Sequence, residues 1–180
     1  MLLTFLFLFC FTHSFGSLVY SESTGIIYND EMDDFSVPNV TNFFGLPPSE
    51  HNFIAPGRRP MSSACPAIIV DSEGDVRLVI GGAGGTKITS AEALVAARYL
   101  LVREDIKTAI DAPRIHHQLH PNKIIYEKDF PIELLDRLSK IGHVTEEVKG
   151  RGSVINAIAK DGHRIQAFYD YRKGGSQAGL

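Results

Sequence analysis

Residues 76–86 read VRLVIGGAGGT, an apolar run that passes directly into a cluster of four glycines. A second apolar run, residues 67–70, precedes it, and the polar segment Ser72-Glu73-Gly74-Asp75 lies between the two. Two apolar runs around a short glycine-bearing segment are typical of a β-hairpin. The hairpin forms the centre of the predicted fold, and we expect both of its strands to be buried.

The glycine cluster leads into a predicted helix. Thr89 and Glu92 have the spacing of a capping box, which places the start of the helix at Thr89. The apolar residues that follow at helical spacing would form its core face: Ala93, Leu94, Ala97, Leu100 and Leu101.

The rest of the chain shows four further elements. We expect a short strand at 24–28, a short helix at 105–111 that ends before Pro113, an amphipathic helix at 131–141, and a second hairpin from 153–159 and 163–169. This order of hairpin, helices and hairpin indicates a mixed α/β (α+β) class and not a regular β-α-β alternation.

Composition limits the classes of protein that fit. The chain has 180 residues, of which 44% are hydrophobic, enough for one domain with a single core. Eighteen basic and 21 acidic residues give a formal charge of −3, and no run of Lys or Arg resembles a nucleic-acid-binding stripe. We therefore expect no nucleic-acid partner.

The first residues resemble a targeting segment. Residues 1–11 are almost entirely apolar, a length that suits the core of a signal peptide and is well short of the roughly 20 residues of a membrane span. Small residues at Ser14 and Gly16 favour cleavage after Gly16, which divides the chain into a leader, 1–16, and a domain, 17–180. The expected location is secreted or on the extracellular face of the plasma membrane. The alternative for this run is a buried, Phe-rich β-strand.

A polar segment, residues 29–64, precedes the first hairpin and contains two motifs. Residues 29–35 read NDEMDDF, and residues 60–66 read PMSSACP. Loops of this length inside a domain usually form a site. If the chain is secreted, Asn39-Val40-Thr41 is also an acceptor sequence for N-glycosylation.

Each motif has a functional and a structural interpretation. The carboxylates of 31–34 suit an ammonium group, but charge runs also simply face water. Ser62 and Ser63 suit a carboxylate, although serines also merely keep a loop soluble. Gly84 and Gly85 follow a strand and precede a helix, so their N–H groups could stabilise a developing negative charge, or the pair could be only a tight turn.

Three histidines, His116, His117 and His120, suggest a metal site because residues four apart share a helix face. Pro113 and Pro121 limit any helix here, and no acidic or cysteine ligand is near. We therefore expect no metal and no other cofactor.

These motifs, together with Asp111–His116 and Arg172–Gly175, resemble the small subunit (light chain) of the γ-glutamyltransferase family, also called glutathione hydrolases. The resemblance extends from about Phe15 to Leu180. It implies an N-terminal-nucleophile hydrolase fold, an αββα sandwich of which this chain supplies the small-subunit half and a large subunit the remainder.

The resemblance also implies a role for each motif in binding a γ-glutamyl donor such as glutathione. Glu31 and Asp34 would hold the α-amino group of the donor, Ser62 and Ser63 its α-carboxylate, and Gly84 and Gly85 would form the oxyanion hole. In the family this site cleaves the γ-glutamyl bond and transfers the γ-glutamyl group to water, amino acids or peptides.

The nucleophile is the part of the resemblance that this sequence lacks. The family uses an N-terminal threonine in a Thr-x-His-x-Ser-Val type motif, which is not found here, and Cys10 and Thr12 replace its Thr-x-Asn pair. We expect the chain to be inactive alone. The alternatives are a non-catalytic secreted binding or interaction protein and a truncated gene product.

Overall fold

The computed structural model of the chain describes residues 16–150 and 152–176, so the predicted leader lies outside the described residues except for Gly16. The regular elements of this part, in chain order, are β1 (Ala67–Val70), β2 (Val76–Ala83), α1 (Ile88–Leu100), α2 (Ile106–Asp111), β3 (Ile115–His117), β4 (Ile124–Tyr126), α3 (Ile132–Lys140), β5 (Thr145–Glu147), β6 (Val154–Asp161) and β7 (Arg164–Phe168).

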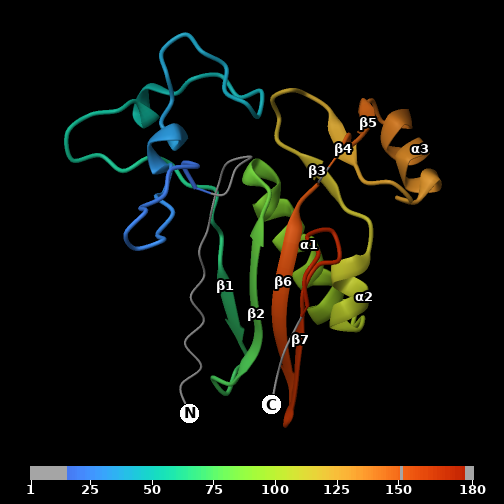
Figure 1. The fold of residues 1–180 in the computed structure, drawn as a ribbon. Helices are drawn as coiled ribbons and strands as arrows, with labels where there is room; N and C mark the ends of the chain where they lie inside the picture. Colours follow the sequence, from blue (N-terminus) through green and yellow to red (C-terminus); the bar gives the residue numbers. More distant parts are fainter. Residues whose placement is uncertain (1–15, 151, 177–180) are drawn as a thin grey trace.

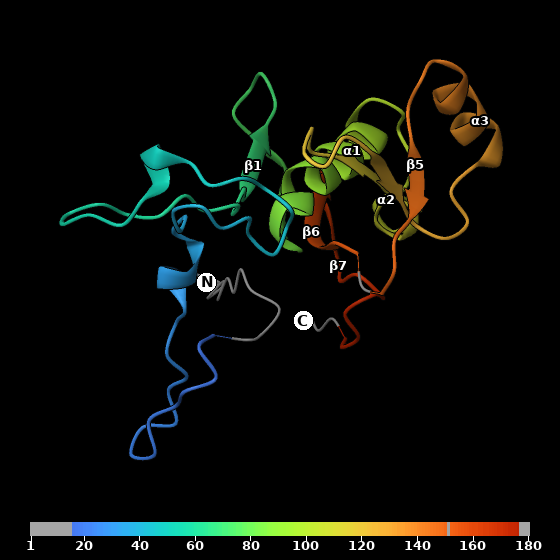
Figure 2. The same ribbon diagram turned by 90° about the horizontal axis from the view of Figure 1, so that it is seen from above.

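Four antiparallel strands form the main sheet in the order β1-β2-β6-β7, and α1 and α2 lie against one of its faces (Figures 1 and 2). Both predicted hairpins are confirmed, β1–β2 and β6–β7. The long β2 and β6 strands pair in the centre, where Ile80 lies opposite Ala157 and Ala83 opposite Val154. This pairing places the glycine cluster beside the start of β6.

The core lies between this sheet and the two helices. Leu78, Val95, Ile106, Ile110 and Ile155 are fully shielded from solvent, at 0% exposure. Burying an aliphatic side chain of this kind typically stabilises the fold by about 1.5–3 kcal/mol. The helix predicted at 105–111 is confirmed as α2, and the side chain of Asp105 caps it by accepting from the N–H groups of Lys107 and Thr108.

The opposite face of the main sheet has exposed apolar side chains, which corrects our expectation that both strands of the first hairpin are buried. Successive side chains of a strand point to opposite faces, so only alternate residues of β1 reach the core. Ile68 is 68% exposed and Val70 53%. On β7 at the other edge, Ile165 is also 68% exposed.

The helix after the glycine cluster differs from its prediction in start and face. A 3₁₀ turn (η3, Gly85–Lys87) leads into α1, which begins at Ile88 with no side-chain cap, so Thr89 already lies within the helix. Its buried residues are Ile88, Ala91, Glu92 and Val95, whereas Ala93 and Leu101 of the predicted core face are exposed. The capping-box interpretation was wrong, and Glu92 is a buried carboxyl group.

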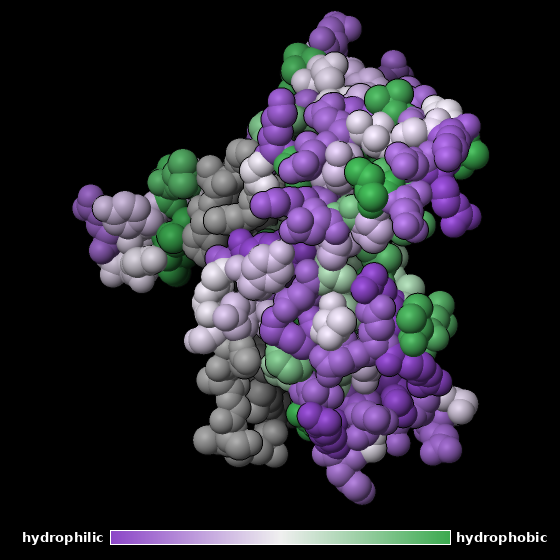
Figure 3. Space-filling view, turned by 90° about the vertical axis from the view of Figure 1, so that its right-hand side faces the viewer, coloured by the Kyte–Doolittle hydropathy of each residue, from purple (hydrophilic) through white to green (hydrophobic). Residues whose placement is uncertain are grey.

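A second, three-stranded sheet in the order β3-β4-β5 was not predicted. This sheet packs beside α3. The helix α3 confirms the predicted amphipathic helix, and its Leu135 is buried. On the side of the molecule where α2 and α3 lie, apolar side chains are scattered among polar ones (Figure 3).

Residues 29–64, here named the lid, form a long loop beyond the end of β1 (Figure 1). The loop contains two 3₁₀ turns, η1 (Glu31–Asp34) and η2 (Glu50–Asn52). Before the lid, residues 16–28 form an arm that projects on the side of the main sheet away from the helices (Figure 2). The strand predicted at 24–28 is only an isolated bridge between Tyr20 and Ile27. None of the described helices is long and apolar enough to cross a membrane.

Candidate functional site

The glycine turn, Gly84 and Gly85, connects β2 to the start of α1 and has a backbone that only glycine adopts readily. Gly84 has φ +140° and Gly85 φ +60°. A Cβ on Gly84 would lie 2.9 Å from the Cα of Ser153, and a Cβ on Gly85 would overlap the ring of Phe44. The backbone of Ser153 thus excludes a side chain at Gly84, and the positive φ favours glycine at Gly85, where the neighbour is a side chain that can shift.

The turn precedes an uncapped helix. The first N–H groups of an α-helix have no partner within the helix, and the helix dipole adds partial positive charge at this end. No side chain caps α1, and the side chain of Lys87, whose pKa burial lowers, is adjacent. This end of the helix is therefore suited to negative charge.

The acidic motif forms the η1 turn in the lid. Burial, together with the negative charges of Glu31, Asp30 and Asp33, raises the pKa of Asp34 to about 6. Four carboxylates so close together repel one another, and a bound cation would relieve that repulsion. Glu31 is exposed and Asp34 half-buried.

Asn52, which the sequence analysis did not identify, joins the acidic motif to the serine motif. Its Nδ2 donates to the carbonyl oxygen of Asp34 at 2.8 Å and to the hydroxyl of Ser36 at 3.3 Å, and its Oδ1 accepts from the N–H of Met61 at 2.8 Å. Ser62, the residue after Met61, is exposed, and Ser63 is half-buried. The structure thus brings together two motifs that are about 30 residues apart in sequence.

The lid contacts the glycine turn through Phe44. Its ring occupies the space beside Gly85, and its carbonyl oxygen accepts from Nε2 of Gln118 at 2.7 Å. Oε1 of Gln118 in turn accepts from the hydroxyl of Thr86 at 2.7 Å. Gln118 was also missed from sequence, because an amide in a loop has no periodic signal.

The predicted residues do not share one enclosed pocket. A small cavity of about 20 Å³ lies behind the glycine turn and is lined by Lys87, Ser90, Arg114, His116 and Ser153 among others. A larger hollow of about 430 Å³ lies beside Glu127 and Arg172. Neither of these two is lined by the acidic or the serine motif, each of which has one exposed and one half-buried predicted residue.

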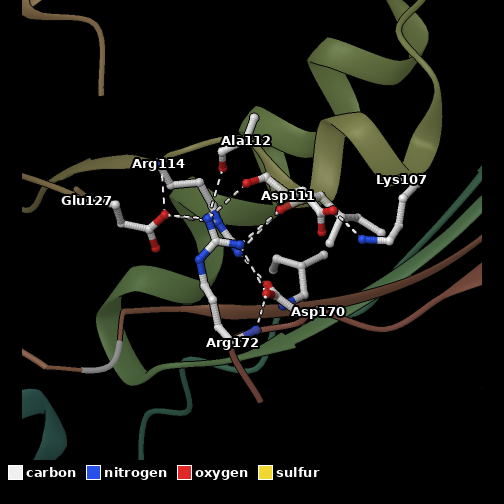
Figure 4. A network of polar contacts seen from close by, with 9 residues as sticks. Lys107, Asp111, Ala112, Arg114, Glu127, Asp170 and Arg172 are labelled. Carbon is white, nitrogen blue, oxygen red and sulfur yellow. Dashed lines mark hydrogen bonds and ion pairs between the residues drawn. The ribbon is translucent and has the colours of Figure 1, made fainter. Parts of the chain in front are cut away.

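A buried network of charged side chains lies beside the small cavity, which Arg114 also lines (Figure 4). Asp170 is fully buried and pairs with Arg114 and, at 3.0 Å, with Arg172, which also pairs with Glu127 at 2.6 Å. Burial disfavours the charge of Asp170, but hydrogen bonds from Arg114 and from the N–H groups of Arg172 and Ile155 outweigh it and lower its pKa. The network joins the two segments, Asp111–His116 and Arg172–Gly175, that carry part of the family resemblance.

Two of the three histidines have side-chain hydrogen-bond partners within the protein. His116 bonds to Ser90 and Gln118, while His117 bonds to Asn122 and accepts from the N–H of Leu119. Within residues 16–150 and 152–176 no three His, Cys, Asp or Glu side chains gather as a metal site.

Comparison with known proteins identifies the family. The family model described as gamma-glutamyltranspeptidase matches residues 10–180. The chain belongs to the gamma-glutamyltranspeptidase family. It is 52% identical over 166 residues to Scoloptoxin SSD14 and 51% identical over 167 residues to Scoloptoxin SSD20, both from Scolopendra dehaani. It is 40% identical over 161 residues to Glutathione hydrolase proenzyme 1 from Schizosaccharomyces pombe.

The gamma-glutamyltranspeptidase relatives differ in how much of them the chain spans. The matches to SSD14 and SSD20 each include 92% of this chain. They span 29% of the length of SSD14 and 85% of the length of SSD20, and the match to the yeast proenzyme spans 25% of that protein. Among solved structures, gamma-glutamyltranspeptidase from Pseudomonas nitroreducens complexed with L-DON shares 35% identity and a TM-score of 0.80, over 92% of this chain and 88% of that one. The fold is therefore the expected N-terminal-nucleophile hydrolase fold, in its light-chain portion.

Proposed function

We propose that this chain supplies the donor-binding and oxyanion-stabilising part of an assembly that cleaves the γ-glutamyl bond of glutathione or a related donor. The observation that carries the proposal is the Gly84–Gly85 turn at the uncapped start of α1, in a chain of the gamma-glutamyltranspeptidase family. Two N–H groups fixed in such a turn suit the oxyanion of acyl transfer.

The donor's own charges match the lid. Its α-ammonium group would pair with Glu31 and Asp34, where it would relieve the repulsion among the carboxylates. Its α-carboxylate would accept hydrogen bonds from Ser62 and Ser63. Asn52 supports this arrangement because it bonds to the main chain of both motifs.

The bond-breaking step needs a nucleophile that the motifs of this sequence do not include. A nucleophilic hydroxyl would attack the γ-carbonyl carbon, and the oxyanion would form opposite the N–H groups of Gly84 and Gly85. The C–N bond would then break, the departing amine would take the proton, and water or an acceptor amine would release the γ-glutamyl group. We propose that another chain supplies the nucleophile.

The partner we propose is a gamma-glutamyltranspeptidase large subunit that covers the face of the main sheet away from the helices. Ile68, Val70 and Ile165 are exposed there on two edge strands. Exposed apolar residues on sheet edges are a typical feature of surfaces that a partner covers.

We also propose that the chain is secreted and carries a glycan on Asn39. This residue is exposed with φ +62°, in a lid turn where its side chain is accessible. Expression in a secreting eukaryotic cell followed by glycosidase digestion would test this, with Asn39→Gln as the control. An unchanged mass on digestion would contradict it.

The main experiment is hydrolysis of γ-glutamyl-p-nitroanilide by the full chain, alone and coexpressed with a homologous large subunit. We expect turnover only with the partner, and loss of at least a hundredfold in Asp34→Asn. The exposed Asp136→Asn on α3 is the matched control and should not reduce turnover. A folded complex without turnover, with L-glutamate still bound, would favour the non-catalytic alternative.

A further inference from the structure

We propose that Gln118 is a positioning residue that holds the lid against the glycine turn, and so sets how the donor-binding motifs lie relative to Gly84 and Gly85. The inference rests on the proposed function. Gln118 follows β3, and its partners come from the lid, from η3 and from β3 itself. Its amide bonds both to Phe44 of the lid and to Thr86, the residue that follows the glycine turn.

All four hydrogen-bonding positions of the Gln118 amide are filled. Nε2 donates to the carbonyl oxygens of Phe44 and His120, both at 2.7 Å. Oε1 accepts from the Thr86 hydroxyl at 2.7 Å and bonds to Nε2 of His116 at 2.9 Å. A side-chain amide has two N–H donors and two acceptor positions, so no capacity is left over.

These partners also fix the orientation of the amide. A main-chain carbonyl can only accept, so the NH₂ group must face Phe44 and His120, and Oε1 must face Thr86 and His116. His116 therefore carries a proton on Nε2 and donates it to Gln118.

The arrangement continues into α1. Burial is the main cause that lowers the pKa of His116, which keeps the ring neutral at pH 7, so its Nδ1 must accept. The hydroxyl of Ser90 lies 2.7 Å from this nitrogen and 3.1 Å from the carbonyl oxygen of Lys87, and it has one proton to give. Both of these atoms can only accept from Ser90, so its one proton faces the two of them. Ser90 thereby joins α1 to His116, which donates to Gln118, the amide that holds the lid.

The position of these contacts explains why the link affects the site. Thr86 is the residue after Gly85, and the ring of Phe44 lies where a side chain on Gly85 would be. Gln118 therefore bonds to Thr86, which follows the glycine turn in sequence, and to Phe44, whose ring packs against that turn. Without it, the Phe44 carbonyl loses a donor and the Thr86 hydroxyl loses its acceptor at once.

The first test is hydrogen exchange of the full chain measured by mass spectrometry. In Gln118→Leu we expect exchange at least tenfold faster in 42–48 and 85–90, and unchanged within twofold in α3. Gln118→Glu keeps an acceptor for Thr86 and His116, but its carboxylate repels the carbonyl oxygens of Phe44 and His120. Of the two segments, only 42–48 should therefore exchange faster. Gln166→Leu, on β7, is the matched control and should alter neither segment.

A second readout tests position and not folding alone. The carboxylate of Gln118→Glu should raise the pKa of His116, measured by NMR titration, because it accepts from the ring. Faster exchange across the whole chain in Gln118→Leu, with no movement of the His116 titration in Gln118→Glu, would overturn the proposal. Should Gln118→Leu fail to fold, Thr86→Val removes one contact of the set and should loosen 85–90.

Binding of L-glutamate, measured by calorimetry, separates this inference from the proposed function. If wild type binds, Gln118→Leu should bind at least tenfold more weakly while Gln166→Leu binds normally. If wild type does not bind but the exchange pattern appears, the donor site is wrong and the link between lid and turn stands. Equal binding by wild type and Gln118→Leu, with unchanged exchange, would overturn the positioning role.

Discussion

The body of the protein, residues 67–150 and 152–172, and the lid, residues 29–64, are held together by different forces. The body buries Leu78, Ile106 and Ile155 completely between sheet and helices. The lid, all of which the structure describes, has no fully buried residue. Its order comes instead from turns and side-chain amides, such as Asn42, whose Oδ1 accepts from the N–H groups of Phe44 and Leu46 at 3.0 Å.

The difference teaches which region can move without the other. Hydrophobic burial makes the body cooperative, whereas a hydrogen bond typically contributes only about 0.5–1.5 kcal/mol net. Segments with little buried apolar surface open locally at a free energy well below that of global unfolding. The proposed donor-binding motifs thus lie on the more mobile region, and the glycine turn on the rigid one.

The largest expected effect is in the body, from Asp170→Asn. Without the charge of Asp170, the buried Arg114 loses its closest counter-charge, which typically costs about 3–5 kcal/mol. Urea unfolding of the full chain measures this loss. Asp161→Asn is the control, because its pair with Arg77 is exposed and should contribute under about 1 kcal/mol. Equal losses in both variants would contradict the assignment of the buried network to the body's stability.

The next largest effect depends on pH and comes from Glu92. Burial raises its pKa to about 7 and outweighs a main-chain contact with Gly82 that lowers it; within the described residues this contact does not meet the geometry of a hydrogen bond. Between about pH 4.5 and pH 7 the folded state holds a proton that the unfolded state has released, so stability falls as pH rises through this window.

Glu92→Gln should remove that slope. Because one pH unit of displacement corresponds to about 1.4 kcal/mol, we expect wild type to lose about 3 kcal/mol relative to the variant between pH 4 and pH 8. Thermal and urea unfolding across this range measure the difference. Glu133 lies on the exposed side of α3, so the stability of Glu133→Gln should change with pH as that of wild type does. Parallel curves for Glu92→Gln would show that Glu92 finds a partner when charged.

A smaller effect, confined to the lid, is expected for Asn52→Ala. The three hydrogen bonds of Asn52 join Asp34 and Met61, so their loss should speed hydrogen exchange about tenfold in 31–36 and 60–64. Global stability should change by less than about 1 kcal/mol, because the body does not depend on these bonds. The exposed Asn122→Ala is the control. A global loss as large as that of Asp170→Asn would mean that lid and body unfold together.

Local signals predicted much of the body. The two hairpins, α2 and α3 each depend on residues close in sequence, and all were predicted, although the Asp105 cap of α2 was not. The β3-β4-β5 sheet was not, because three-residue strands have no visible period and β4 pairs in parallel with β5 some 20 residues away. Glu92 was misread because the 3₁₀ turn after Gly84 moves the helix start, and only tertiary packing decides which face is buried.

The lid shows a sharper limit of sequence analysis. Its motifs were recognised, as was the glycine turn, but the residues that connect them, Asn52 and Gln118, were not. A loop amide has no periodicity, and its partners are up to 74 residues away in sequence. Sequence thus identified groups with distinctive chemistry, while the residues that hold those groups in place emerged only from the folded structure.

The smallest expected change is a shift in a pH midpoint, and it tests the lid's chemistry directly. If Asp34 binds the ammonium group of L-glutamate as a carboxylate, affinity should fall about tenfold per pH unit below pH 6, near its raised pKa. Asp34→Asn should bind weakly at every pH. Calorimetry between pH 5 and pH 8 measures both.

Asp33→Asn separates this effect from a general loss of negative charge. Asp33 is exposed, and its charge is one of the causes that raise the pKa of Asp34. Its neutralisation should therefore leave the affinity at pH 8 within a fewfold of wild type and move the midpoint below pH 6. If both variants lost affinity equally and kept the same midpoint, the η1 carboxylates would act as a diffuse field, and Asp34 would have no specific role.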